Sequence, residues 1–214
     1  MDIATLSLYV LVAFGAVVSP GPAVLLAITL GTQVGVRKTW FAILGNVIGV
    51  AVVSVLSALG LGAVLAASGL AFTVLKLIGA AYLIYLGIKS WRAREFMKVP
   101  EQNSETAAMR VSGWELFRRA FLIAVTNPKA ILFFTALFPQ FISTQSAMLP
   151  QLVVLTGIFM AMSFSVLTGY AVIGSKAQKW LFEPIRMRWF KRVTGGLFVS
   201  MGILLATQSR AQSA

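Results

Sequence analysis

Long apolar runs alternate with polar connections along the whole chain. Hydropathy divides these runs into six helical spans at about 3–30, 41–67, 70–90, 116–142, 149–174 and 193–208. A helix needs roughly 20 mostly apolar residues to cross a bilayer. Of the 214 residues, 58% are apolar and 11% are charged, and a soluble domain of this size cannot bury so much apolar surface. The pattern therefore predicts an all-α integral membrane protein with six transmembrane helices, surrounded by lipid.

Basic residues gather in alternate connections between the spans. The first, third and fifth connections hold 15 of the 18 Lys and Arg residues, whereas those near 67–70 and 142–149 hold none. Positively charged loops stay on the cytoplasmic side, so we expect both termini outside. The net charge of +12 is then explained by topology, and no nucleic-acid partner is predicted. The N-terminus lacks a basic n-region, so we expect the first span to be retained.

Prolines interrupt two spans that occupy equivalent positions in the two halves of the chain. The motifs are S19-P-G-P22 in the first span and T126-N-P-K129 in the fourth, and their first prolines are 108 residues apart. The second and fifth spans, and the third and sixth, follow at similar offsets. Three spans per half reverse the direction of the second half. The sequence therefore predicts a 3+3 inverted repeat with broken helices 1 and 4, in one membrane domain: a first repeat at 1–91, a cytoplasmic connecting loop at 92–115 and a second repeat at 116–214.

A proline inside a helix removes one backbone N–H and crowds the carbonyl four residues earlier. Pro20 would free the carbonyl of Ala16, and Pro22 would free that of Val18. In hydrocarbon such carbonyls need partners from protein, water or ligand. Transporters use these breaks at the repeat interface, where half-helix N-termini face anionic groups and loose carbonyls face cations. The two breaks predict a midplane site for a zwitterionic amino acid. The alternative is that each proline merely kinks its helix.

Eight residues are the candidates for substrate binding: Ser19, Pro20, Gly21, Pro22, Asn46, Asn127, Pro128 and Lys129. Lys129 lies within the fourth span with no acidic neighbour in sequence, and it is also the candidate for proton coupling. It could bind a substrate carboxylate or lose its proton during transport; the alternatives are snorkelling to an interface or pairing with carbonyls at the break. Asn46 either lines the cavity or forms an interhelical hydrogen bond beside a contact made by Gly45 and Gly49. Ser163 and Tyr170 are further polar positions deep in the fifth span.

Several classes of chemistry are excluded by composition. The chain has no Cys and no His, so thiolate or imidazole ligands and Ser-His catalysis are ruled out. No carboxylate lies deep in a span, so a carboxylate proton relay or a cage for a divalent metal is hard to build. We therefore expect no metal, no cofactor and no enzyme. The spacings of Gly31 with Gly35 and of Gly45 with Gly49 would permit contacts within one chain or in a homodimer.

Four stretches resemble signatures of the lysine-exporter (LysE/RhtB) family, and its homoserine and threonine efflux branch is the closest likeness. They are S19-P-G-P22, G79-A-A-Y-L-I-Y-L-G87, T126-N-P-K-A-I-L-F-F134 and F138-P-Q-F-I142. The resemblance covers essentially the whole chain. It implies a multi-pass exporter of amino acids or related metabolites in the bacterial inner membrane, driven by the proton motive force, and a role for both proline motifs. We expect this exporter to work by alternating access.

Asn46 departs from one feature of that family. Exporters of lysine and arginine carry an acidic residue in the second span, around this position, whereas the residue here is neutral. The difference favours a neutral substrate such as threonine, homoserine or homoserine lactone. Two alternatives stay open: an exporter of basic amino acids or of another small metabolite, and a membrane scaffold that transports nothing.

Overall fold

A computed structural model describes residues 3–19, 21–67, 69–92, 111–143, 146–181 and 184–207. These residues form helices joined by short turns, with no strand among them, so the all-α prediction is confirmed for the described chain. In order, the elements are α1 (Ile3–Val18), α2 (Pro22–Ala67), α3 (Gly69–Arg92), α5 (Gly113–Val125), α6 (Pro128–Leu132), the π-helical turn η2 (Phe133–Leu137), the 3₁₀ turn η3 (Phe138–Phe141), α7 (Met148–Leu181) and α8 (Pro184–Thr207).

Some of these elements differ in extent from the predicted spans. α2 has 46 residues and joins the first two spans, but it turns back at Gly35, whose φ of 77° and ψ of 165° are not helical. A positive φ is readily adopted by glycine because it has no Cβ. α5 begins at Gly113, inside the stretch 92–115 that we assigned to the connecting loop, and α8 begins at Pro184 rather than near 193.

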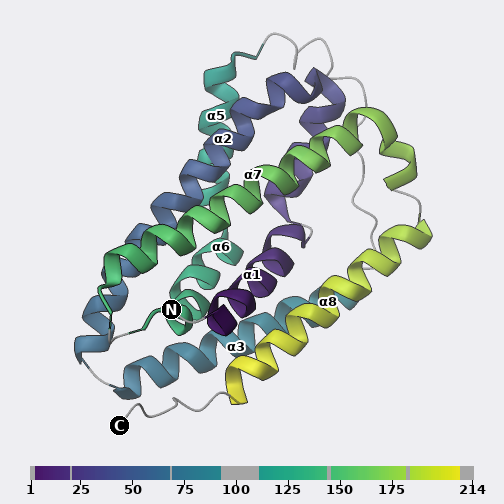
Figure 1. The fold of residues 1–214 in the computed structure, drawn as a ribbon. Helices are drawn as coiled ribbons and strands as arrows, with labels where there is room; N and C mark the ends of the chain where they lie inside the picture. Colours follow the sequence, from purple (N-terminus) through teal and green to yellow (C-terminus); the bar gives the residue numbers. More distant parts are fainter. Residues whose placement is uncertain are drawn as a thin grey trace.

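The helices are arranged around a central pair of short elements (Figure 1). On one side of the molecule α2 packs against both α5 and α7, on the other α3 and α8 run side by side, and α1 and α6 lie between them. α1 contacts both α7 and α8, and η2 contacts both α2 and α3. The interrupted helices therefore occupy the middle of the fold, where they are covered from both sides.

Glycines allow α2 to approach α5 and α7 at backbone distance. A Cβ built on Gly45 would stand 2.1 Å from the carbonyl oxygen of Phe117 in α5, and one on Gly31 would stand 2.2 Å from that of Ala171 in α7. Residues with small side chains are what such close helix contacts in membranes require. Both glycines are therefore used for contacts inside the chain.

An aromatic cluster fills the space between α1 and the segment after α6. Tyr9 is fully buried, its ring lies 5.1 Å from that of Phe141 and 6.1 Å from that of Phe138, and its hydroxyl donates to the carbonyl oxygen of Leu155 at 2.8 Å. Edge-on ring packing of this kind adds to the burial of apolar area. The cluster holds α1 against the second half of the chain.

The outer surface of the helices is apolar over long stretches. Leu56, Leu59 and Leu149 are each more than 60% exposed. The stretches Pro22–Gly60 and Met148–Lys176 are long and apolar enough to cross a membrane, and Thr5–Val18 is a shorter apolar helix. An apolar exterior of this extent fits a bilayer better than water.

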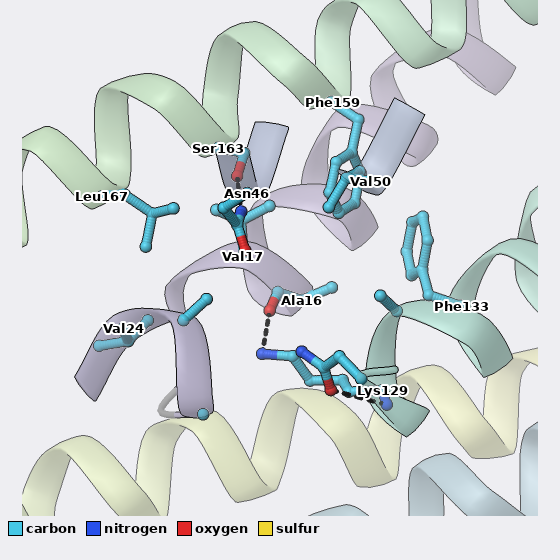
Figure 2. A pocket seen from close by; sticks show the side chains of 14 residues that line it. Ala16, Val17, Val24, Asn46, Val50, Lys129, Phe133, Phe159, Ser163 and Leu167 are labelled. Atoms are coloured by element: carbon cyan, nitrogen blue, oxygen red, sulfur yellow. Dashed lines mark hydrogen bonds between the residues drawn. The ribbon is translucent and has the colours of Figure 1, made fainter. Parts of the chain in front are cut away.

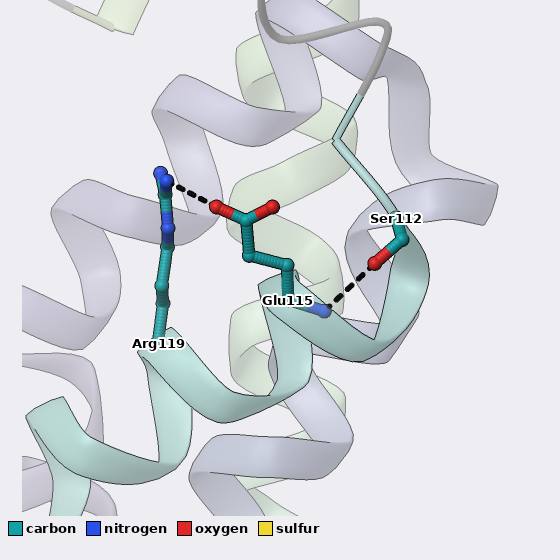
Figure 3. Close-up of polar contacts among 3 residues, drawn as sticks. All are labelled: Ser112, Glu115 and Arg119. Carbon is teal, nitrogen blue, oxygen red and sulfur yellow. Dashed lines mark hydrogen bonds and ion pairs between the residues drawn. The ribbon is translucent and has the colours of Figure 1, made fainter.

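α5 begins with a capped N-terminus (Figure 3). The hydroxyl oxygen of Ser112 accepts from the backbone N–H of Glu115 at 3.2 Å, and Glu115 pairs with Arg119 one turn later. A serine before the first turn satisfies a donor that the helix itself leaves free. The cap fixes where α5 starts, and thereby the depth at which the helix breaks 13 residues later.

The glycine contact between α2 and α5 predicts a difference between two Gly→Ala substitutions. Gly45→Ala should lower the free energy of unfolding by about 1–3 kcal/mol, because a methyl group overlaps a carbonyl of α5. Gly157→Ala, in α7, is the matched control: a Cβ there meets nothing within 4 Å, so the better helix propensity of Ala should leave stability equal or up to about 1 kcal/mol higher. Thermal unfolding of both variants in detergent measures the difference. Equal stability of the two variants would refute the close contact.

Candidate functional site

The break between α1 and α2 leaves two carbonyls that the prolines cannot pair, and side chains pair both of them. The carbonyl oxygen of Ala16 accepts from the hydroxyl of Ser19 and from Nζ of Lys129, each at 2.9 Å. The carbonyl oxygen of Val18 accepts from the hydroxyl of Tyr170 at 2.9 Å. The expected cost of a proline break in hydrocarbon is therefore met by donors from α6 and α7.

Lys129 binds the end of α1 with its whole ammonium group. Its Nζ donates to the carbonyl oxygen of Ala16 at 2.9 Å (Figure 2). The same Nζ lies 3.1 Å from the carbonyl oxygen of Ser19 and 2.8 Å from its Oγ. An ammonium has three N–H donors, and the C-terminal end of a helix attracts positive charge. Of the alternatives that the sequence left open, pairing with the break carbonyls is the arrangement observed.

Gly21 leaves space beside this ammonium. A Cβ at this position would stand 3.3 Å from Nζ of Lys129, which is tighter than an ordinary contact between unbonded atoms. α2 then begins at Pro22, and its first backbone bond runs from the N–H of Leu25 to the carbonyl of Gly21 at 3.0 Å. The N–H groups of Ala23 and Val24 therefore have no acceptor inside the helix.

The second break, between α5 and α6, is closed locally. The side-chain oxygen of Asn127 accepts from the backbone N–H of Lys129 at 3.1 Å, and the carbonyl of Asn127 accepts from the N–H of Ile131 at 3.0 Å. Pro128 is the first residue of α6. A backbone N–H at this position would have no acceptor inside the helix, so its absence in proline costs no hydrogen bond. Asn127 is thus the N-cap that restarts the helix, and the first donor of α6 is already occupied.

A cavity of about 50 Å³ lies between the two breaks. Its polar lining comes from Asn46, Asn127, Lys129 and Ser163, and its apolar lining includes Phe133 and Phe159. Space of this size holds a few water molecules. The cavity is therefore a small, mainly apolar chamber into which four polar side chains project, with the Lys129 ammonium at its edge.

Asn46 joins α2 to α7 at the wall of this cavity. Its side-chain amide donates to Oγ of Ser163 at 3.4 Å, and both residues are buried. The two roles considered for Asn46 are thus both present, because it lines the cavity and also bonds between helices.

The structure brings five of the eight candidates together: Ser19, Gly21, Asn46, Asn127 and Lys129. Pro22 and Pro128 begin the two helices that follow the breaks, and Pro20 lies outside the described residues. Ser163 and Tyr170 were identified from sequence only as polar positions in an apolar span, and nothing in the pattern connected them with the breaks. Among the described residues no group of three or more carboxylates could hold a metal ion.

The fold and the site define a helical membrane protein in which two interrupted helices meet at a small cavity that contains four polar side chains. The chain matches the LysE type translocator family over residues 14–209, and it belongs to that family.

Relatives with similar sequences span nearly the full chain. The chain is 38% identical over 207 residues to an uncharacterised membrane protein of Vibrio cholerae, covering 97% of this chain and 98% of that protein. It is 37% identical over 193 residues to the homoserine/homoserine lactone efflux protein of Salmonella typhimurium, covering 90% and 91%. It is 33% identical over 168 residues to the leucine efflux protein of an Enterobacter species, covering 75% and 77%. No solved structure matches the chain.

The bond from Tyr170 to the break predicts a cost for removing one hydroxyl. Tyr170→Phe should lower the free energy of unfolding by about 1–3 kcal/mol, because it deprives the Val18 carbonyl of the donor it has within the membrane. Tyr85→Phe is the control, since that ring is 54% exposed, and its effect should stay within about 0.5 kcal/mol. Thermal unfolding in detergent compares the two. A Tyr170→Phe variant as stable as Tyr85→Phe would contradict the role of this bond.

Proposed function

We propose that this protein exports neutral amino acids or their derivatives across the bacterial inner membrane, by alternating access driven by the proton motive force. The observation that carries the proposal is the cavity between the two helix breaks, whose few polar groups include the Lys129 ammonium. Two relatives point to the same substrate class: one is named for efflux of homoserine and its lactone, the other for efflux of leucine. None of these compounds has a charged side chain.

The proposed topology is six spans in a 3+3 inverted repeat with both termini outside. It is supported by the pairing of equivalent elements, since α2 packs against α7 and α3 packs against α8, as a two-fold axis in the membrane plane would arrange them. α2 also reverses direction at Gly35, next to the basic residues Arg37 and Lys38. Positively charged connections stay on the cytoplasmic side, so the proposed topology places this turn in the cytoplasm.

In the proposed binding mode the substrate spans the gap between the two breaks. The carbonyl oxygens at the end of α1 would accept from its α-ammonium, and Lys129 with the N–H groups at the start of α2 would hold its carboxylate. Ser19, Gly21 and Pro22 shape the first break, while Asn127 and Pro128 fix the position of Lys129. At about 50 Å³ the cavity as it stands is too small for an amino acid, so binding requires the halves to move apart.

Transport by purified protein tests this proposal. In proteoliposomes, wild-type protein should exchange labelled threonine, homoserine or leucine in a saturable way, faster with an imposed pH gradient. Lys129→Ala should reduce this exchange at least about tenfold, because a charge-assisted contact with the substrate is lost. Lys89→Ala, in the last turn of α3, is the matched control and should leave exchange unchanged. Near-normal exchange by Lys129→Ala would contradict the role of Lys129. A folded wild type that exchanges no amino acid would favour another metabolite or the scaffold.

Because the side chain of Asn46 is neutral, we expect the protein to prefer neutral amino acids over basic ones. Asn46→Asp places a carboxylate at the cavity wall, so exchange of lysine relative to threonine should rise about tenfold or more. Asn46→Ser is the neutral control and should keep the preference for threonine. Counterflow with both labelled amino acids measures the ratio. An unchanged ratio in Asn46→Asp would show that position 46 does not face the substrate side chain.

A further inference from the structure

The end of α1 forms a binding place for a primary ammonium, and Lys129 fills it. Its three acceptors are the carbonyl oxygens of Ala16 and Ser19 and Oγ of Ser19, at 2.8 to 3.1 Å from Nζ. Three acceptors match the three N–H donors of one ammonium. The acceptors belong to the first half of the chain and the ammonium to the second, 110 and 113 residues later.

The α-ammonium of an amino acid has the same charge and the same three donors as the end of a lysine side chain. Building on the proposed function, we propose that Lys129 occupies the substrate's ammonium subsite when no substrate is bound. An arriving amino acid exchanges with it: the substrate ammonium takes the acceptors of Ala16 and Ser19, and Lys129 turns to the substrate carboxylate. Gly21, which has no side chain beside Nζ, leaves room for that turn.

On energetic grounds this exchange favours a zwitterion over a derivative that lacks one of the two charges. A ligand with an ammonium and no carboxylate would displace Lys129 without giving it a partner, and an unpaired cation in this apolar surrounding is costly. A ligand with a carboxylate and no ammonium would draw Lys129 away and leave the carbonyls of Ala16 and Ser19 unpaired. A zwitterion pairs all the groups at once, so the number of charge-assisted bonds is kept.

The exchange also connects substrate binding to movement of the two halves. While Lys129 binds the end of α1, its side chain ties α6 to the break between α1 and α2. Once Lys129 binds the substrate instead, the direct tie is replaced by one that runs through the ligand. A ligand shifts a conformational equilibrium when it interacts differently with the two conformations. Here the ligand replaces a direct contact between the two halves by one that runs through itself, so its binding affects how the halves move relative to each other.

Ligand binding, measured apart from transport, tests the exchange. Purified protein in detergent at pH 6 is titrated with homoserine, with homoserine amide, which keeps the ammonium and lacks the carboxylate, and with N-acetylhomoserine, which lacks the ammonium. Affinity is taken from the ligand-induced rise in the unfolding midpoint. In wild type, homoserine should bind at least about tenfold more tightly than either derivative.

Lys129→Met should reverse part of this preference. With the subsite vacant, the ammonium of homoserine amide binds without displacing a cation, so its affinity should rise about tenfold over wild type while that of homoserine falls. Lys89→Met is the matched control and should keep the wild-type order. A Lys129→Met variant that keeps the wild-type preference for homoserine over its amide would overturn the exchange.

Two further outcomes separate the inference from the function on which it rests. If Lys129→Met does not fold, the affinities measured for the wild-type protein still test the exchange. Equal affinities for homoserine and homoserine amide would overturn it. If the wild type binds neither homoserine nor threonine nor leucine, the proposed function fails and the exchange fails with it.

Discussion

Backbone carbonyls at the end of a broken helix need donors when the helix lies in hydrocarbon, and the centre of this protein is arranged around that need. The prolines at positions 20 and 22 supply no N–H. Lys129 and Ser19 donate to the carbonyl of Ala16, and Tyr170 donates to that of Val18. One local interruption thereby ties α1 to α6 and α7, and it places a cation and several acceptors beside the cavity.

The two breaks meet the same need in different ways. Asn127 closes the second break with its own side chain and backbone, so nothing from elsewhere in the described chain is needed there. The first break depends on donors more than 100 residues away. Bonds between distant elements can be exchanged for bonds to a ligand without unfolding a helix end. The first break is therefore the one suited to binding, and the second fixes Lys129 in its position.

Much of this arrangement follows from the sequence, because prolines, deep polar residues and apolar runs are visible without coordinates. The all-helical fold, the position of both helix restarts and the meeting of Ser19, Asn46, Asn127 and Lys129 were predictable in this way. The turn at Gly35 falls in the connection expected between the first two spans. The early start of α8 was not predicted, because its first residues are partly basic and hydropathy marks only apolar runs. Tyr170 was missed as a partner because no periodicity tells which helix faces a break. The long side chain of Lys129 reaches either a carbonyl or a ligand, so the sequence left its partner open.

An amino acid bound at the first break would shield the residues of the cavity wall, and single-cysteine protection measures that shielding. The chain has no Cys, so Ala23→Cys, at the cavity wall, and Lys176→Cys, exposed in α7, each carry one thiol. Labelling by a small methanethiosulfonate reagent is followed in proteoliposomes with and without saturating homoserine. We expect homoserine to slow labelling at position 23 and to leave position 176 unchanged. Equal labelling at position 23 with and without a transported amino acid would contradict binding at the break.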